Sequence, residues 1–363
     1  NRTVVESNPV TLDARRPAAT ITSDLTAFSP NKDGFADSVK IRLVSAFTDG
    51  LAHFIVEIRD RNGTRVRRLT EGTHLDQSAQ FLWDGSLDDG LTIALDGEYT
   101  PWAQLEYAKG DQITLSGKAI RLDRTPPNIS ISLGPQPFSP DGDGVNDVLS
   151  ITLSAEDASE INGWKLSILD PAGSIFTSFS GKTLPPEPIL WDGYNLNNEL
   201  IEAAQEYSYI VQVRDVLGNM ATKTGSLSTD VFVIKDGDRL KIRISSIVFP
   251  PNSSNLFGMD NETNQRNQAI LDRLGVVLKK YASYRIRIEG HGVNLSGTER
   301  EERTELEALS LERARAVMAA LVERGIEKNR IEAKGLGGRE PLVPHTDEAN
   351  RWKNRRVEFI LMR

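Results

Sequence analysis

Apolar and polar residues alternate along the first two thirds of the chain. Two examples are Phe54–Arg59 and Tyr209–Arg214, and Asp-Gly and Asn-Gly pairs separate many such runs. Alternation between these turn pairs is typical of β-hairpins, because successive side chains on a strand point to opposite faces. No segment between residues 17 and 235 carries a sustained helical period. This part of the chain is therefore predicted to be all β.

An internal repeat divides this β-rich part into two modules. The run Phe28–Asp37 recurs 110 positions later as Phe138–Asp147. Three further landmarks follow in the same order, with a slip of only two residues: Asp60–Gly63 and Asp170–Gly173, Trp83–Gly85 and Trp191–Gly193, Glu98–Thr100 and Glu206–Ser208. Modules of about 110 residues with many short strands predict immunoglobulin-like β-sandwiches.

The periodicity changes after Asp236–Asp238. Apolar residues then recur at three- and four-residue steps from Ile270 to Tyr281 and from Ala314 to Val322, which predicts two amphipathic helices. Gly325 suits the end of the second helix. Four alternating segments predict strands: Leu240–Ile244, Tyr284–Glu289, Arg330–Ala333 and Val357–Leu361. The order β-α-β-α-β-β predicts an open sheet with both helices on one face.

The predicted organisation is multidomain. An N-terminal extension covers residues 1–16, all-β sandwiches cover residues 17–125 and 126–236, and an α/β domain covers residues 237–363. A chain of 363 residues is long enough for each of these domains to bury its own core.

Charge is spread unevenly between these parts. From Gly237 onward there are 23 Lys and Arg against 18 Asp and Glu, a net charge of +5. The rest of the chain carries a net charge of −13, which gives the total of −8. The mildly basic tail suits an acidic ligand but is too sparse for a nucleic-acid interface. No apolar run approaches the roughly 18 residues of a membrane helix, so no transmembrane segment is predicted.

The sequence contains no persuasive catalytic constellation. It has no cysteine, so disulfides and thiol chemistry are excluded. Nucleophile-elbow, metalloprotease and phosphate-loop motifs are missing, and the four histidines are scattered: His53, His74, His291 and His345. The chain is predicted to be no enzyme and to need no cofactor.

Two features of the repeat allow functional interpretations. Asp141, Asp143 and Asp147 resemble the start of a calcium loop, although Lys32 interrupts the matching run in the first copy and side chains capping their own turn explain the pattern equally well. The tryptophans of the two Trp-Asp-Gly landmarks are expected to be core anchors rather than glycan-stacking platforms.

Both parts of the chain resemble known bacterial families. The two modules resemble the immunoglobulin-like domains of flagellar hook-capping and gliding-motility proteins. Both carry the Phe-Ser-Pro and Trp-Asp-Gly motifs, and the second also carries the Asp215–Asn219 motif. The last third resembles the OmpA-like peptidoglycan-binding domain. It carries that family's motifs in order, namely Gly290-His291, Leu309–Ala314, Gly335–Gly337 and Asn354–Glu358.

The resemblance implies a site for the stem peptide of peptidoglycan. In the family, the helix arginine holds a carboxylate and an aspartate pairs with an ammonium group. Here Arg313 matches the arginine, but the threonine and aspartate positions of the family motif are occupied by Gly292 and Val293. The residues expected to line the site are His291, Asn294, Arg313, Arg355 and Arg356.

Two functions fit this altered motif. In the first, the protein is a structural component of the cell envelope that still binds peptidoglycan, in an altered mode or with a loop acid replacing the aspartate (Glu299, Glu301 or Glu302). In the second, the pocket no longer binds peptidoglycan and the domain is a scaffold for a periplasmic or envelope protein. The resemblance implies a periplasmic location and leaves a tether to the outer membrane open.

Overall fold

The computed structural model describes residues 12–363, so most of the expected N-terminal extension lies outside the described residues. The chain forms two compact units. Of the described residues, one unit comprises residues 12–128, 155–163 and 213–221, and the other comprises residues 129–154, 164–212 and 222–363. No helix among the described residues is long and apolar enough to cross a membrane.

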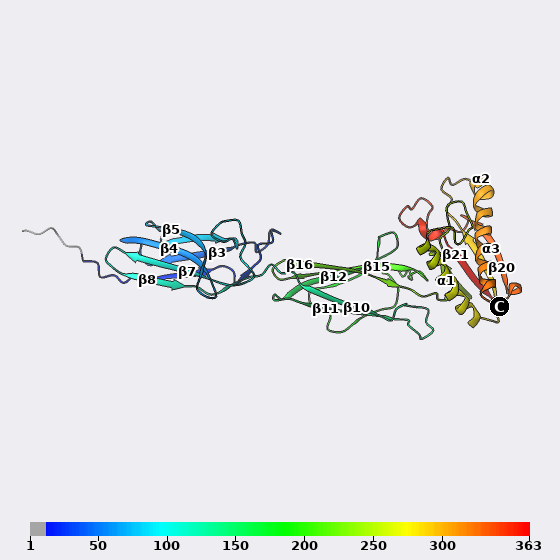
Figure 1. Ribbon diagram of the computed structural model, residues 1–363, viewed down its shortest axis with the longest axis horizontal. Coiled ribbons are helices and arrows are strands. Elements are labelled where there is room, and N and C mark those ends of the chain that lie inside the picture. Colours follow the sequence, from blue (N-terminus) through cyan, green and yellow to red (C-terminus); the bar gives the residue numbers. More distant parts are fainter. Residues whose placement is uncertain (1–11) are drawn as a thin grey trace, which may run out of the picture. The chain divides into compact units, whose positions relative to one another are not determined.

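The first β-rich module contains two sheets that enclose one core (Figure 1). The smaller sheet has the order β1-β3-β6 and the larger has the order β2-β9-β7-β4-β5, with β8 paired to β7. Ile41 on β3, Val56 on β4 and Leu105 on β7 have no solvent exposure. The strands are β1 (Ala19–Ser23), β2 (Ala27–Phe28), β3 (Val39–Ser45), β4 (Leu51–Asp60), β5 (Arg65–Gly72), β6 (Ser78–Trp83), β7 (Gly97–Tyr107), β8 (Gln112–Ser116) and β9 (Ile120–Leu122).

The second module also has two sheets, with the orders β10-β11-β14 and β13-β12-β15-β16. No helix occurs in either module, as the alternating pattern predicted. The strands are β10 (Asn128–Gly134), β11 (Leu149–Glu156), β12 (Ile161–Leu169), β13 (Ile175–Gly181), β14 (Ile189–Trp191), β15 (Glu206–Asp215) and β16 (Met220–Ser228).

The sequence repeat corresponds to a repeat of strand register. Trp83 pairs with Val39 across β6 and β3, and Trp191 pairs with Leu149 across β14 and β11. Trp83 is 1% exposed and its indole donates to the Ser86 carbonyl at 3.0 Å. Trp191 is 3% exposed and donates to the carbonyl three residues later at 2.8 Å. The expectation that both tryptophans are core anchors is confirmed.

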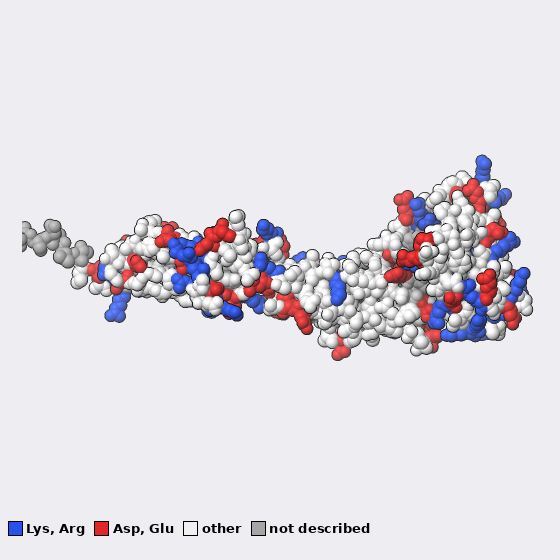
Figure 2. Space-filling view, in the orientation of Figure 1, with Lys and Arg blue, Asp and Glu red and all other residues white. Residues whose placement is uncertain are grey.

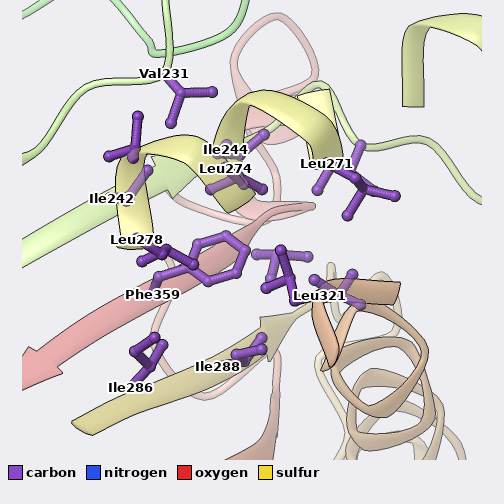
Figure 3. Close-up of a cluster of buried hydrophobic side chains, with 14 of the residues drawn as sticks. Val231, Ile242, Ile244, Leu271, Leu274, Leu278, Ile286, Ile288, Leu321 and Phe359 are labelled. Atoms are coloured by element: carbon purple, nitrogen blue, oxygen red, sulfur yellow. The ribbon is translucent and has the colours of Figure 1, made fainter. Parts of the chain in front are cut away.

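The C-terminal domain is a five-stranded sheet with two long helices on one face. The sheet order is β17-β18-β21-β19-β20, with β19 and β20 parallel. Figure 3 shows the core between sheet and helices, where Ile242, Ile288 and Phe359 meet Leu274 and Leu321. The elements are β17 (Ile234–Asp236), β18 (Arg239–Ile244), α1 (Asn261–Lys280), β19 (Arg285–His291), α3 (Glu307–Glu323), β20 (Ile331–Gly337) and β21 (Val357–Met362).

Two glycines allow α3 to approach this sheet closely. A Cβ atom on Gly290 of β19 would lie 2.2 Å from the Ser310 carbonyl oxygen, and one on Gly335 of β20 would lie 2.3 Å from the backbone carbonyl oxygen of Glu307. Neither distance is sterically acceptable, so both positions require glycine. These are the two glycines that begin the Gly-His and Gly-Leu-Gly motifs.

The structure differs from the sequence-based prediction at two places. The edge strand β17 pairs with β18, so the C-terminal sheet begins at Ile234, ahead of the expected boundary at residue 237. The sequence predicts Glu299, Glu301 and Glu302 to be loop residues, but the segment after Thr298 is helical. It forms α2 (Glu299–Glu301) and the π-helical η1 (Glu302–Leu306) ahead of α3. Thr298 caps this helical segment by accepting from the Glu301 amide, which satisfies a terminal donor.

Candidate ligand-binding site

Arg313 projects from α3 toward the loop that follows β18. Its Nε donates to the Ser253 carbonyl at 2.9 Å and its Nη2 donates to the Pro250 carbonyl at 3.2 Å. The guanidinium carbon lies 5.0 Å from the centroid of the Phe249 ring. These contacts fix the orientation of the side chain, while Nη1 donates no hydrogen bond to any described residue.

No carboxylate of the described residues neutralises the charge of Arg313. Neither Arg313 nor the exposed Arg355 forms an ion pair within residues 12–363. Partial burial, followed by the nearby charge of Arg355, lowers the pKa of Arg313. Two close arginines without a carboxylate, one of them half-buried, create a positive site that an anion would stabilise.

The family's aspartate position provides no charge. Val293 is 8% exposed, and the preceding Gly292 donates its amide to the Gly337 carbonyl at 2.7 Å. This segment therefore presents backbone and an apolar side chain to its neighbours. It offers no carboxylate to an ammonium group.

The three loop acids considered as replacements already have partners. Glu299 lies 2.6 Å from Arg303 Nε and 3.4 Å from Arg339 Nη2. Glu301 accepts the Ser296 amide at 2.8 Å. Glu302 is 3% exposed and accepts the Gly338 amide at 2.8 Å. Ion pairs account for the carboxylate of Glu299, and hydrogen bonds to loop amides account for those of Glu301 and Glu302.

Asn294 helps to hold this loop in place. Its Nδ2 donates to the Thr298 carbonyl at 3.1 Å and to Glu302 at 3.2 Å. Its Oδ1 is buried without a hydrogen-bond partner among the described residues. A Cβ atom on Gly338 would lie 2.9 Å from Asn294 Cβ, so the loop packs tightly against the end of β20.

His291 and Arg356 are placed together, in a group that does not include Arg313. Arg356 is 5% exposed, donating from Nε to Glu358 at 2.7 Å and from Nη2 to the Glu340 carbonyl at 3.1 Å. The backbone amide of His291 donates to the Arg356 carbonyl at 3.0 Å. Burial, then the charge of Arg356, lowers the pKa of His291 to about 3, so its imidazole is neutral at physiological pH.

Of the five predicted site residues, Arg313 and Arg355 form the positive site. Asn294 supports the loop after β19. His291 and Arg356 belong to a polar cluster with Glu289 and Glu358, which the sequence analysis did not single out. Alternation along the strands was the available signal for this cluster, because residues two positions apart on a strand share a face. Glu289 precedes His291 by two positions, and Glu358 follows Arg356 by two.

Among residues 12–363, three groups of side chains have the composition of a metal site. In each group one potential ligand atom per residue lies within 4.8 Å of the others. The groups are Glu289, His291 and Glu358; Asp123, Asp157 and Asp215; and Asp141, Asp143 and Asp147.

The candidate calcium loop has a structural explanation. The carboxylate of Asp147 accepts backbone amides of Gly142 at 2.6 Å and Gly144 at 2.7 Å. In the first module, Asp37 accepts the amides of Lys32 at 2.6 Å and Gly34 at 2.9 Å. The same turn thus forms where a lysine interrupts the acidic run, so turn closure accounts for the shared aspartate.

Comparison with known proteins places the C-terminal domain in a class. The model of the OmpA family matches residues 248–355, and this domain is OmpA-like. A stretch of 95 residues is 39% identical to the peptidoglycan-associated lipoprotein of Rhizobium meliloti, covering 26% of this chain and 51% of that protein. A stretch of 134 residues is 28% identical to the probable lipoprotein YiaD of Escherichia coli, covering 37% of this chain and 56% of that protein.

A solved structure gives a similar partial match. The crystal structure of a putative MotB-like protein from Desulfovibrio vulgaris is 28% identical, with a TM-score of 0.30, covering 36% of this chain and 77% of that chain. Of the two lipoproteins described above, the chain spans about half the length of each.

Proposed function

We propose that this protein is a non-catalytic structural component of the cell envelope, whose OmpA-like domain binds peptidoglycan through Arg313 and Arg355. The observation that carries the proposal is the half-buried Arg313, which is oriented by two carbonyl groups and has no carboxylate partner among the described residues. A stem-peptide carboxylate would complete this site. The similarity to a peptidoglycan-associated lipoprotein supports the same class of ligand.

The proposed binding mode differs from that of the family at the ammonium contact. Val293 cannot pair with a cation, and the nearby acids Glu299, Glu301 and Glu302 have partners of their own. Burying an unpaired ammonium is costly. The preferred ligand is therefore a carboxylate whose neighbouring group is neutral or stays in water.

The two β-rich modules are proposed to be immunoglobulin-like domains over residues 17–125 and 126–236 that support the OmpA-like domain in the periplasm. Their two-sheet cores and repeated tryptophan register agree with this assignment. Figure 2 shows positive and negative side chains interspersed over the visible face of the C-terminal domain. Such mixing supports an envelope ligand or partner over nucleic acid.

Sedimentation of the full chain with purified sacculi tests the proposal. Wild type should sediment, and Arg313→Ala should weaken binding at least about tenfold, the loss expected for a charge-assisted contact. Arg315→Ala is the matched control, because Arg315 lies on the same helix but is exposed and pairs with Glu312 at 2.6 Å. Equal sedimentation of the two variants would contradict the assigned site.

A Val293→Asp variant tests the altered mode. If the pocket is intact, restoring the family's carboxylate should increase affinity for sacculi whose stem peptides carry a free ammonium. No gain would indicate that the ligand does not reach Val293. Release of soluble fragments from the sacculi over time would argue instead for an enzyme.

The apolar Val293 also favours a second function, a scaffold for an envelope protein with an OmpA-like pocket that does not bind peptidoglycan. In that case neither wild type nor Val293→Asp would sediment with sacculi. A partner captured from envelope extracts would then remain bound in the presence of excess muropeptide.

A further inference from the structure

A histidine and two glutamates meet on the face of the C-terminal sheet that the helices leave uncovered. Glu289 on β19 lies opposite Glu358 on β21 in the antiparallel register. His291 follows Glu289 by two positions, with a register irregularity between Gly290 and His291. Their potential ligand atoms lie within 4.8 Å of one another.

The histidine lacks the contacts that normally accompany burial. His291 is 4% exposed, and neither Nδ1 nor Nε2 has a hydrogen-bond partner within the described part of the chain. Buried polar side chains are nearly always paired, since leaving them unpaired destabilises the fold. Turn closure, which explains the group of Asp141, Asp143 and Asp147, does not involve this ring.

Glu289 is also weakly partnered. It is 8% exposed, and its carboxylate accepts no hydrogen bond from residues 12–363. Arg287 Nη1 lies 3.9 Å from Glu289 Oε1, while Arg287 Nε donates to Glu332 at 2.5 Å. This carboxylate therefore retains the lone pairs that a cation needs.

Glu358 keeps room for one more contact. Its Oε1 accepts from Arg356 at 2.7 Å and from Arg243 at 3.3 Å, and its Oε2 lies 3.0 Å from Lys241 Nζ. A carboxylate has about four lone-pair positions, of which these contacts use three. The fourth can bind a cation while the existing contacts persist.

We propose that Glu289, His291 and Glu358 bind a divalent transition-metal ion of the zinc class and so join β19 to β21. One imidazole nitrogen with carboxylate oxygens is a donor set suited to zinc, whereas magnesium and calcium prefer oxygen alone. The site is separate from the Arg313 site and does not depend on peptidoglycan binding.

The test is zinc titration of the full chain by calorimetry after treatment with EDTA. Wild type should bind one zinc ion that Glu289→Gln and His291→Gln each weaken at least about tenfold. Zinc should also raise the Tm of wild type by a few degrees but not that of Glu289→Gln. His53→Gln is the matched control, because His53 is partly exposed and lies 3.1 Å from Glu71.

The outcomes are distinct. The proposal is overturned if wild type takes up no zinc, or if Glu289→Gln binds zinc as wild type does. A loss of zinc binding in His53→Gln alone would also overturn it. Should His291→Gln fail to fold, Glu289→Gln still decides, because Glu289 accepts no hydrogen bond from the described residues that the substitution would remove.

Discussion

Arg356, which directly precedes β21, and Glu358 on β21 form an ion pair in which each side chain is only 3% exposed and Nε lies 2.7 Å from Oε1. Burial alone would raise the pKa of Glu358, but the charges of Arg356 and Lys241 outweigh it and lower that pKa to about 2. The carboxylate therefore stays ionised within the sheet. The pair anchors β21, the strand between β18 and β19.

Removing Arg356 should destabilise the C-terminal sheet. Arg356→Met would leave a buried carboxylate with fewer compensating charges, and we expect a loss of about 3 kcal/mol in unfolding free energy. Hydrogen exchange of the β21 amides, measured by mass spectrometry on the full chain, reports this loss. The control is Arg303→Met, whose 70% exposed side chain should contribute under about 0.5 kcal/mol. Similar exchange in both variants would show that the buried ion pair adds nothing to the stability of the sheet.

Gly290 should tolerate no side chain. Gly290→Ala would place a methyl group 2.2 Å from the Ser310 carbonyl oxygen and force α3 away from β19, at a cost of about 3 kcal/mol. Thermal unfolding by calorimetry should show a lower Tm. Gly163→Ala serves for comparison, since nothing lies within 4 Å of a Cβ atom there. Equal Tm values would mean that α3 packs less closely than described.

Trp191 should contribute strongly to the second module. Trp191→Ala removes a 3% exposed ring together with its hydrogen bond to the Tyr194 carbonyl, and we expect a loss of about 3–5 kcal/mol. Faster exchange of the β11 and β14 amides is the measurement. Leu196→Ala, at a 94% exposed position, should leave these amides unchanged. If the two variants behave alike, the tryptophan is not the core anchor of this module.

The three aspartates at 123, 157 and 215 should make stability depend on pH. Burial, followed by the charges of Asp123 and Asp215, raises the pKa of Asp157 above its usual 3.8. A raised carboxyl pKa means that the folded state holds the proton more tightly. This contribution to stability is present below pH 3.8 and is lost as the pH rises through the raised value.

Asp157→Asn should remove that dependence. Urea unfolding of wild type and variant in EDTA, from pH 3.5 upward, should show the wild type losing stability relative to the variant as the pH rises. Asp143→Asn offers a comparison at an exposed aspartate of the Asp141–Asp147 loop. Parallel pH profiles for Asp157→Asn and wild type would show that the three carboxylates do not repel one another.

Much of the fold could be predicted because it depends on local patterns. Alternation predicted the β-rich modules, and three- to four-residue steps predicted α1 and α3, with Gly325 ending α3 at a φ of 87°. The edge strand β17 was missed because it is three residues long and its only signal is pairing with β18. The helical turn after Thr298 was missed because its charged sequence has no apolar period, and capping with Glu299–Arg303 pairing stabilises it instead.

The candidate site was predictable only in part. The family motif identified Arg313, but the sequence did not reveal that carbonyl groups of Pro250 and Ser253 hold it, since these lie 60 or more positions away. The motif also grouped His291 and Arg356 with Arg313. Strand pairing determines that these two residues meet Glu289 and Glu358 instead, and that depends on register rather than on composition.

The carbonyl contacts of Arg313 have a consequence for affinity and for the rate at which a bound anion would dissociate. A free arginine samples many rotamers and loses that freedom when it binds, whereas this one is confined before any ligand arrives. An anion would therefore meet a preorganised donor. Changes that only loosen the backbone around Pro250 and Ser253 would then act chiefly by letting the ligand dissociate faster.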